Sequence, residues 1–219
     1  MRTTRLVAID RRQPDPRVLA DAVADLQAGR LVAFPTDTVY GLGCDATNEQ
    51  ALQDLYQAKD RPSHLPLIVL LPEPQHLARY SPAVPPLAWQ AAKRFWPGPL
   101  TIIVPALGTL SRILTGGGDT IGLRLPRDPV ARALAAALPL ASTSANLSGR
   151  PAPRTAAEVM EQLGGRIDLV LDAGPVAGEP STVVDFSVSP PALLRPGPIT
   201  PAALQEALGE LQLPPPSPL

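Results

Sequence analysis

The order of strand-like and helix-like segments limits the fold of this chain more than any other feature of its sequence. Apolar runs bounded by turn residues alternate loosely with segments in which apolar residues recur at helical spacing, and this alternation predicts one α/β domain. Two expected strand pairs, 100–104 with 121–125 and 182–186 with 192–195, have connections too short for a parallel crossover, so the sheet should be mixed. Strands are expected at 30–34, 65–71, 100–104, 121–125, 139–143, 167–171, 182–186 and 192–195, and helices at 15–28, 47–59, 86–95, 128–138, 155–164 and 201–211.

Local signals place the ends of several of these elements. Asp15 followed by Pro16 is typical of a helix start, because the aspartate caps the first turn and proline fits its first position. Thr47 with Gln50 predicts a capping box for the second helix, and 35–43 is expected to be a turn-rich loop. We expect an N-terminal segment at 1–14, one domain over 15–211, and a proline-rich disordered tail over 212–219.

Charge and cysteine content argue against several classes of protein. The formal net charge is −1, so overall electrostatics gives no case for a nucleic-acid-binding surface. The single cysteine, Cys44, cannot form a disulfide within the chain and gives no metal cluster. No uncharged apolar run approaches the ~20 residues of a membrane helix, and the first residues do not resemble a secretory signal. These features favour a cytoplasmic protein.

Polar segments that interrupt the expected core carry four cationic side chains: Lys59, Arg61, Arg124 and Arg195. Lys59 and Arg61 follow the second helix, where positive charge complements the helix dipole, so their placement has a purely structural explanation. Arg124 lies inside a strand between two leucines, and alternation puts it on the opposite face, with Thr120 and Gly122. That face must be wet, or the arginine must have an anionic partner.

Uncharged hydrogen-bonding residues occupy three further loops. The stretch STSAN supplies Ser142, Thr143, Ser144 and Asn146 at the end of a strand, while Thr36 lies in the loop 35–43 and Ser181 precedes the strand at 182–186. Each group alone could be an ordinary hydrogen-bonded turn. Together with the four cations, they suit a polyanion such as a triphosphate. The sequence has no glycine-rich phosphate loop, zinc-ligand pattern or serine-hydrolase motif.

Seven stretches, in order along the chain, resemble the YrdC-like domain family of threonylcarbamoyl-AMP synthases. The Lys-x-Arg-Pro and Ser-x-Asn elements are the most specific of them, and the resemblance covers roughly residues 15–200. The stretches are FPTDTVYGLGCDA, LYQAKDRPSHLPLIVL, RFWPGPLTIIV, TIGLRLPRDP, LASTSANLSGRPA, STVVDF and LLRPGPI.

This resemblance implies a fold and a reaction. The fold is a single domain with a twisted, mixed β-sheet and flanking helices around a deep, positively lined cavity. The reaction joins L-threonine, bicarbonate or CO₂, and ATP into L-threonylcarbamoyladenylate and pyrophosphate, for the N6-threonylcarbamoyladenosine modification of tRNA. Such an enzyme is a nucleotidyltransferase that uses Mg²⁺ on the ATP phosphates, with no metal ligands from protein side chains and no organic cofactor.

The resemblance also implies roles for residues of this chain. Lys59 and Arg61 take the catalytic positions at the phosphates. ATP or the adenylate is expected to contact Lys59, Arg61, Ser142, Ser144, Asn146 and Arg195, and threonine to contact Thr36, Arg124, Thr143 and Ser181, with Arg124 on its carboxylate.

Two departures from the family pattern accompany these implications. Leu70 stands where many relatives carry histidine, and the chain ends soon after the RPG stretch, which indicates the short, single-domain form. tRNA and tRNA-modification proteins are the further partners that the family suggests, and no membrane partner is expected. Three alternatives stay open: a paralogous domain that makes carbamoyl-adenylate, an RNA-binding module, and a YrdC-like protein of unassigned activity.

Overall fold

A computed structural model describes residues 2–214, which form a ten-stranded mixed sheet flanked by helices. Its strands are β1 (Arg5–Ala8), β2 (Val32–Phe34), β3 (Gly41–Asp45), β4 (Ile68–Leu70), β5 (Leu100–Pro105), β6 (Thr120–Arg124), β7 (Leu140–Ser144), β8 (Leu169–Asp172), β9 (Thr182–Asp185) and β10 (Ala192–Arg195). Their order across the sheet is β1-β8-β2-β3-β7-β4-β6-β5-β9-β10. Both short connections join antiparallel strands, β5 with β6 and β9 with β10, so the predicted mixed α/β fold is confirmed.

Side-chain caps explain where several helices begin. Asp15 accepts a hydrogen bond from the backbone N–H of Arg17, and Pro16 occupies the first helical position, as predicted. Asp128 caps the fourth α-helix by accepting from the N–H groups of Val130 and Ala131. The helices are α1 (Pro16–Gln27), α2 (Glu49–Ala58), η1 (Pro74–Arg79, a 3₁₀ helix), α3 (Pro86–Phe95), α4 (Pro129–Ala137), α5 (Ala156–Leu163) and α6 (Pro201–Leu208).

The capping box predicted for α2 is wrong. Asn48 is the N-cap, and its side chain accepts from the N–H of Ala51 at 3.1 Å. The hydroxyl of Thr47 is instead bonded to Asp45, whose Oδ1 also accepts the Thr47 N–H. A carboxylate two residues upstream therefore captures the threonine in a tight turn and leaves the cap to the next residue.

The loop predicted at 35–43 is also partly wrong, because β3 occupies its second half. β3 lies antiparallel to both β2 and β7, in the middle of the sheet. The sequence did not predict this strand because the glycines in GLG have low β-propensity. Here they permit close packing: a Cβ on Gly43 would lie 2.9 Å from both Phe34 Cε1 and Leu140 Cδ1.

Backbone pairing involves residues on both sides of the predicted domain, 15–211. β1, which lies in the predicted N-terminal segment 1–14, pairs in parallel with β8. Gln212 forms an isolated bridge to Ala192 at the start of β10, and its N–H donates to Pro191 O. Of the predicted tail 212–219, residues 215–219 lie outside the described part of the structure.

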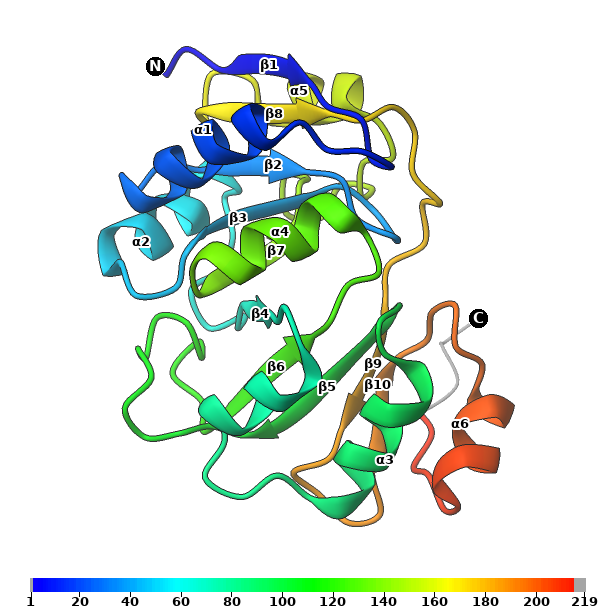
Figure 1. Cartoon of the computed structure of the whole chain (residues 1–219). Coiled ribbons are helices and arrows are strands. Elements are labelled where there is room, and N and C mark those ends of the chain that lie inside the picture. Colours follow the sequence, from blue (N-terminus) through cyan, green and yellow to red (C-terminus); the bar gives the residue numbers. More distant parts are fainter. Residues whose placement is uncertain (1, 215–219) are drawn as a thin grey trace.

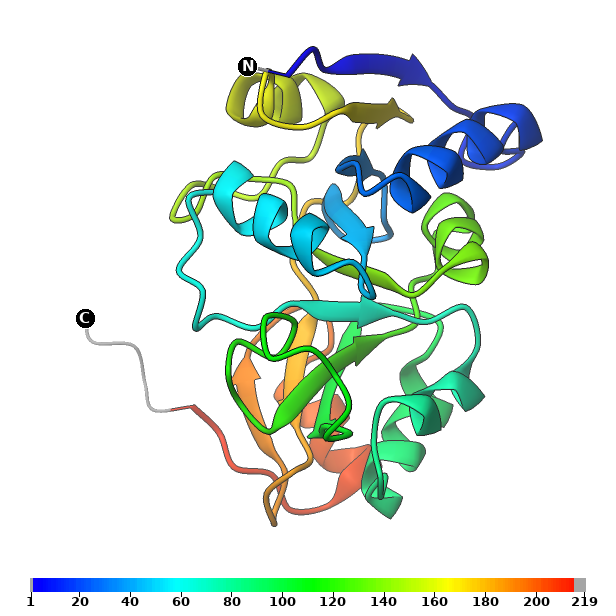
Figure 2. The ribbon, with the colours of Figure 1, turned by 90° about the vertical axis from the view of Figure 1, so that its left-hand side faces the viewer.

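Helices cover both faces of the sheet in the half that contains β1, β8, β2, β3 and β7 (Figures 1 and 2). α1 and α4 lie over one face, and α2 and α5 over the other. Side chains of β2 alternate between these two faces of the sheet. Val32 and Phe34 belong to the apolar cluster that includes residues of α1 and α4. Ala33 belongs to the larger apolar cluster that includes residues of α2 and α5.

In the other half of the sheet, one face packs against α3. The side chains on the opposite face line a cavity. Leu100, Ile102 and Val104 of β5 are buried in the same apolar cluster as the alanines of α3. Thr101 and Ile103 point to the opposite side. None of the helices within residues 2–214 combines the length and apolarity that crossing a membrane requires.

Candidate active site

A cavity of about 290 Å³ opens on this pleat face near the centre of the sheet. The strand registers explain how it forms, because they bring alternate residues of neighbouring strands into rows. One row runs across four strands through Ser142, Ile68, Gly122 and Ile103. Ile68 packs closely over Gly122 in this row, since a Cβ on Gly122 would lie 2.9 Å from Ile68 Cγ2. The cavity is thus built from strands that are distant in sequence.

Arg124 lies at one end of the cavity with its charge already paired. Its Nη2 donates to Asp37 Oδ1 at 2.8 Å, its Nη1 to Thr38 Oγ1 at 2.7 Å, and its Nε to Gly98 O at 3.2 Å. Burial lowers the pKa of Arg124, and Asp37 opposes that shift. Since a guanidinium carries five N–H groups, two remain for a ligand. The predicted face of Thr120, Gly122 and Arg124 does line the cavity, and the anionic partner is Asp37.

Arg195 lies near Arg124 and is held by hydrogen bonds to Ser181. Its Nε and Nη2 donate to Ser181 O at 3.0 and 2.9 Å, and Nη2 also reaches the Ser181 hydroxyl at 3.1 Å. That hydroxyl is bonded in turn to Thr101 Oγ1 at 2.8 Å. Burial and the nearby charge of Arg124 lower the pKa of Arg195. Within residues 2–214, Arg195 has no carboxylate partner, so its charge can act on an anion in the cavity.

Lys59 lies behind the cavity wall, where its ammonium holds the STSAN turn. It is 1% exposed, and its Nζ donates to the backbone carbonyls of Ser144 and Asn146. Burial, and secondarily repulsion by Arg61, lowers the pKa of Lys59 to about 7. Asn146 completes the turn: its Oδ1 accepts from Ser144 Oγ, and its Nδ2 donates to the carbonyls of Leu147 and Arg150 at 2.8 Å. Neither polar group of Asn146 is free.

Arg61 lines the cavity at the edge opposite to Arg124 and Arg195. Its Nη2 donates to Pro66 O at 2.9 Å and its Nε to Leu65 O at 3.3 Å. Burial lowers its pKa as well. Arg61 also borders a second, more open hollow of about 740 Å³ between α2 and the turn at 112–117. Arg61 therefore separates the enclosed cavity from the outer surface.

Eight of the ten residues predicted for the site line this one cavity, and the other two lie directly behind it. The lining residues are Thr36, Arg61, Arg124, Ser142, Thr143, Ser144, Ser181 and Arg195. Lys59 and Asn146 act on the wall through the backbone of the turn. Leu70 also lines the cavity and packs into the apolar cluster beneath α1 and α4. The ligand assigned to each residue stays a prediction.

Three polar residues of the site were not among those assigned to it from the sequence. Asp37 and Thr38 are adjacent to the predicted Thr36 and hold Arg124, while Thr101 supports Ser181. Alternation along β5 is the only signal that could have indicated Thr101. The Asp37–Arg124 pair spans 87 positions, and no local pattern reports such a contact.

Comparisons with known proteins show the family to which this chain belongs. The family model Sua5_yciO_yrdC, described as "Telomere recombination", matches residues 24–197. A protein of Bacillus subtilis named threonylcarbamoyl-AMP synthase is 43% identical over 203 residues, which are 91% of this chain and 58% of that protein. One of Pyrococcus abyssi with the same name is 40% identical over 197 residues, 89% of this chain and 58% of that protein.

A solved structure has the same fold. The crystal structure of P. abyssi Sua5 complexed with L-threonine is 37% identical, with a TM-score of 0.93, and the match covers 96% of this chain and 63% of that one. The present chain thus spans about 60% of the length of these relatives. From the match of the family model and these identities, the chain belongs to the Sua5/YciO/YrdC family.

Proposed function

We propose that this chain is a threonylcarbamoyl-AMP synthase that forms L-threonylcarbamoyladenylate and pyrophosphate from L-threonine, bicarbonate or CO₂, and ATP. The observation that carries the proposal is one cavity that is lined by Arg61, Arg124 and Arg195 together with serine and threonine hydroxyl groups. Relatives that bear this name match about nine-tenths of the chain.

The chemistry needs positioning more than proton transfer, which suits a cavity without histidine. The threonine amine adds to CO₂ and loses a proton to form a carbamate. A carbamate oxygen then attacks the α-phosphorus of ATP, the bond to the bridging oxygen breaks, and pyrophosphate leaves with that bond's electron pair. Charge accumulates on the phosphate oxygens, so fixed cations and hydroxyl donors stabilise the transition state.

On the threonine side, the two unused N–H groups of Arg124 can bind the amino-acid carboxylate while Asp37 keeps the guanidinium in place. Thr36 and Ser181 line the same cavity. Thr143 completes this proposed set.

On the nucleotide side, we assign ATP to Arg61, Ser142, Ser144 and Arg195, with Lys59 and Asn146 shaping the turn behind them. Burial and the Arg61 charge lower the pKa of Lys59, and a bound triphosphate raises that pKa and keeps Lys59 charged. Lys59 and Arg61 are the two residues to which we assign charge stabilisation in catalysis.

Mg²⁺ fits this donor set as part of the nucleotide substrate. Within residues 2–214, no three His, Cys, Asp or Glu side chains form a group that could hold a metal. The hydroxyl and guanidinium groups of the cavity suit phosphate oxygens better than a bare cation. Mg²⁺ bound to ATP would screen the charge of the phosphates.

The product is a mixed anhydride of a carbamate and a phosphate, so a second enzyme must transfer its threonylcarbamoyl group. We propose that the acceptor is tRNA, which makes tRNA-modification proteins the partners of this chain. We propose that the reaction takes place in the cytoplasm, where ATP and tRNA are available.

The test supplies ATP, Mg²⁺, bicarbonate and L-threonine and measures pyrophosphate. Release that requires both threonine and bicarbonate, with a product of the mass of threonylcarbamoyladenylate, supports the proposal. Release that is independent of threonine but stimulated by carbamoyl phosphate would instead indicate the carbamoyl-adenylate reaction. RNA binding without any pyrophosphate release would indicate an RNA-binding module.

A further inference from the structure

Arg11 joins the site to a part of the chain that lies outside the cavity lining. It follows β1 and lies in the connection to α1. Its Nε donates to Asp128 Oδ2 at 2.8 Å, and its Nη2 donates to the backbone carbonyl of Thr36 at 3.2 Å. One guanidinium thus links the N-terminal connection, the start of α4 and the loop that precedes β3.

The Asp128 end of this link is a fixed point. The Asp128 side chain is fully buried, and its Oδ1 accepts from the N–H groups of Val130 and Ala131 in the first turn of α4. Arg11 is therefore the charged partner of a carboxylate that is also held by two backbone N–H groups. Burial raises the pKa of Asp128, and the hydrogen bond from Arg11 opposes this shift.

The Thr36 end of the link leads directly into the cavity. Thr36 Oγ1 donates to Val39 O at 2.6 Å, so it accepts from the hydroxyl of Thr38 in their 2.9 Å contact. Thr38 Oγ1 accepts from Arg124 Nη1 at 2.7 Å. The hydrogen bonds thus have one consistent direction from Arg124 back to the loop that Arg11 holds.

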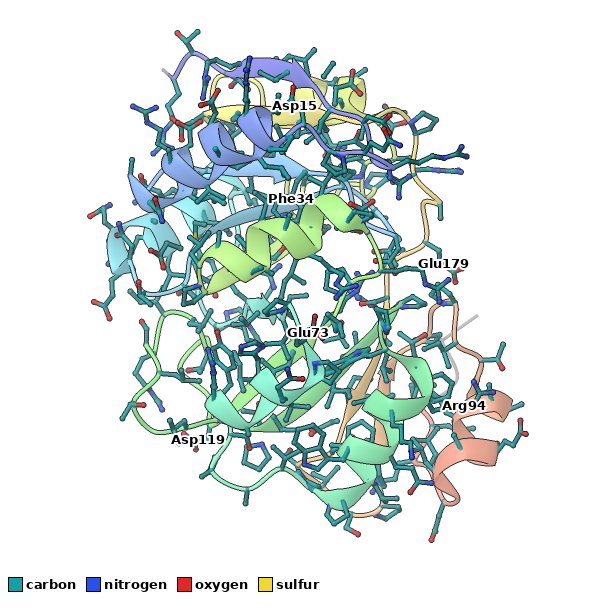
Figure 3. All side chains as sticks on the ribbon, in the orientation of Figure 1. Asp15, Phe34, Glu73, Arg94, Asp119 and Glu179 are labelled. Carbon is teal, nitrogen blue, oxygen red and sulfur yellow. The ribbon has the colours of Figure 1, made fainter. Side chains whose placement is uncertain are left out.

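The same loop is also held by the connection between β8 and β9. Gly178 N–H donates to Thr38 O at 2.6 Å, and the neighbouring Glu179 is labelled in Figure 3. Arg11 and this connection therefore each hold one carbonyl of the loop that carries Asp37 and Thr38.

We propose that Arg11 is a positioning residue for the amino-acid side of the site: through Thr36 and Thr38 it fixes the guanidinium of Arg124. The identity of the amino acid rests on the function proposed above. The alternative is a purely structural role, in which Arg11 only neutralises Asp128 and stabilises the fold. That alternative predicts lower stability without any selective effect on threonine.

The decisive variant is Arg11→Lys, because an ammonium can still pair with Asp128 but cannot also extend a rigid fork to Thr36 O. Arg5→Lys is the matched control. Arg5 lies in the same N-terminal region and pairs with Asp25, whose side chain is 7% exposed, but it makes no contact with the loop 35–40. A second variant, Arg11→Met with Asp128→Asn, removes the loop contact without leaving a buried charge.

Two readouts are measured on the full chain: the KM values for threonine and ATP in pyrophosphate release, and amide hydrogen exchange at residues 36–40. Losing the Thr36 hydrogen bond should raise the threonine KM roughly three- to tenfold in both Arg11 variants, with the ATP KM unchanged. Exchange at 36–40 should become faster in both, and Arg5→Lys should change neither.

An unchanged threonine KM in the Arg11 variants, or an equal rise in Arg5→Lys, would overturn the proposal. If the unmodified chain shows no threonine-dependent reaction, the proposed function fails but hydrogen exchange still decides the positioning role. Faster exchange at 36–40 in the Arg11 variants alone supports that role, and unchanged exchange overturns it.

Discussion

Replacing Lys59 by methionine should reduce the stability of the protein as well as its activity. Lys59 and Arg61 have equivalent positions in the sequence motif, but the structure separates them. Arg61 lies at the cavity edge and donates to two carbonyls of its own following loop, whereas the buried Lys59 ammonium holds two carbonyls on a distant turn.

Methionine matches the length of lysine and preserves its packing, so the loss comes from the two carbonyls, Ser144 O and Asn146 O. Leaving a buried hydrogen-bonding group unpaired costs roughly 1–2 kcal/mol each, which gives about 2–4 kcal/mol in the free energy of unfolding. For a chain of this length, 1 kcal/mol shifts the melting temperature by about 2–4 °C, so the expected decrease is roughly 5–15 °C.

Thermal unfolding followed by calorimetry measures this decrease without any substrate. Lys93 is the other lysine of the sequence and is exposed on α3, so Lys93→Met is a matched control that should leave the melting temperature unchanged. Arg61→Ala should also keep the stability but should reduce turnover more than tenfold, a loss of ~2–4 kcal/mol in charge stabilisation. If the Lys59→Met protein has the same melting temperature as the wild type, the Lys59 ammonium does not stabilise the STSAN turn.

Four further expectations follow from the same contacts. Because the pKa of Lys59 is about 7 and ATP binds the charged form, kcat/KM for ATP should fall as pH rises above 7, and Lys59→Arg should abolish that fall in a pH series. Arg124→Lys loses the fork that reaches Asp37 and Thr38, so the threonine KM should rise roughly tenfold while the ATP KM stays constant; equal rises would count against the carboxylate role. Asn146→Ala should weaken ATP binding in calorimetry by ~1–3 kcal/mol, whereas Ser148→Ala should be tolerated, because the buried Ser148 Oγ has no partner within residues 2–214. Gly43→Ala should cost ~1–3 kcal/mol in denaturant unfolding, since its Cβ would meet Phe34 and Leu140 at 2.9 Å; unchanged stability would mean that β3 can shift.

Local signals in the sequence predicted the structure correctly where a few neighbouring residues determine it. Asp15 and Asp128 mark helix starts because a cap acts over three residues. The alternation around Arg124 placed it correctly on a polar face, since the pleat of one strand decides that. The cations and hydroxyl groups could be predicted as a set but not as a geometry.

The features that were missed depend on packing between distant segments. β1 has four residues and is largely exposed, so neither alternation nor a long apolar run marks it, and it forms by pairing with β8. β3 contains two glycines that a local scale counts as turn residues, although close contact with Phe34 requires them. The partners of Lys59 are backbone carbonyls 85 and 87 positions away, which side-chain patterns do not report.

The strand order also determines when the site can form during synthesis. β5 needs β9 as its neighbour, with Leu100 opposite Thr182, and Arg195 arrives on the last strand of the sheet. A nascent chain that stops before Ser181 therefore presents β5 with one open edge and a half-built cavity. Pairings of this sequence separation form slowly, and unpaired edges attract other strands. Ribosome-bound intermediates of this chain should consequently bind chaperones until β9 and β10 emerge, and should retain no ligand before then.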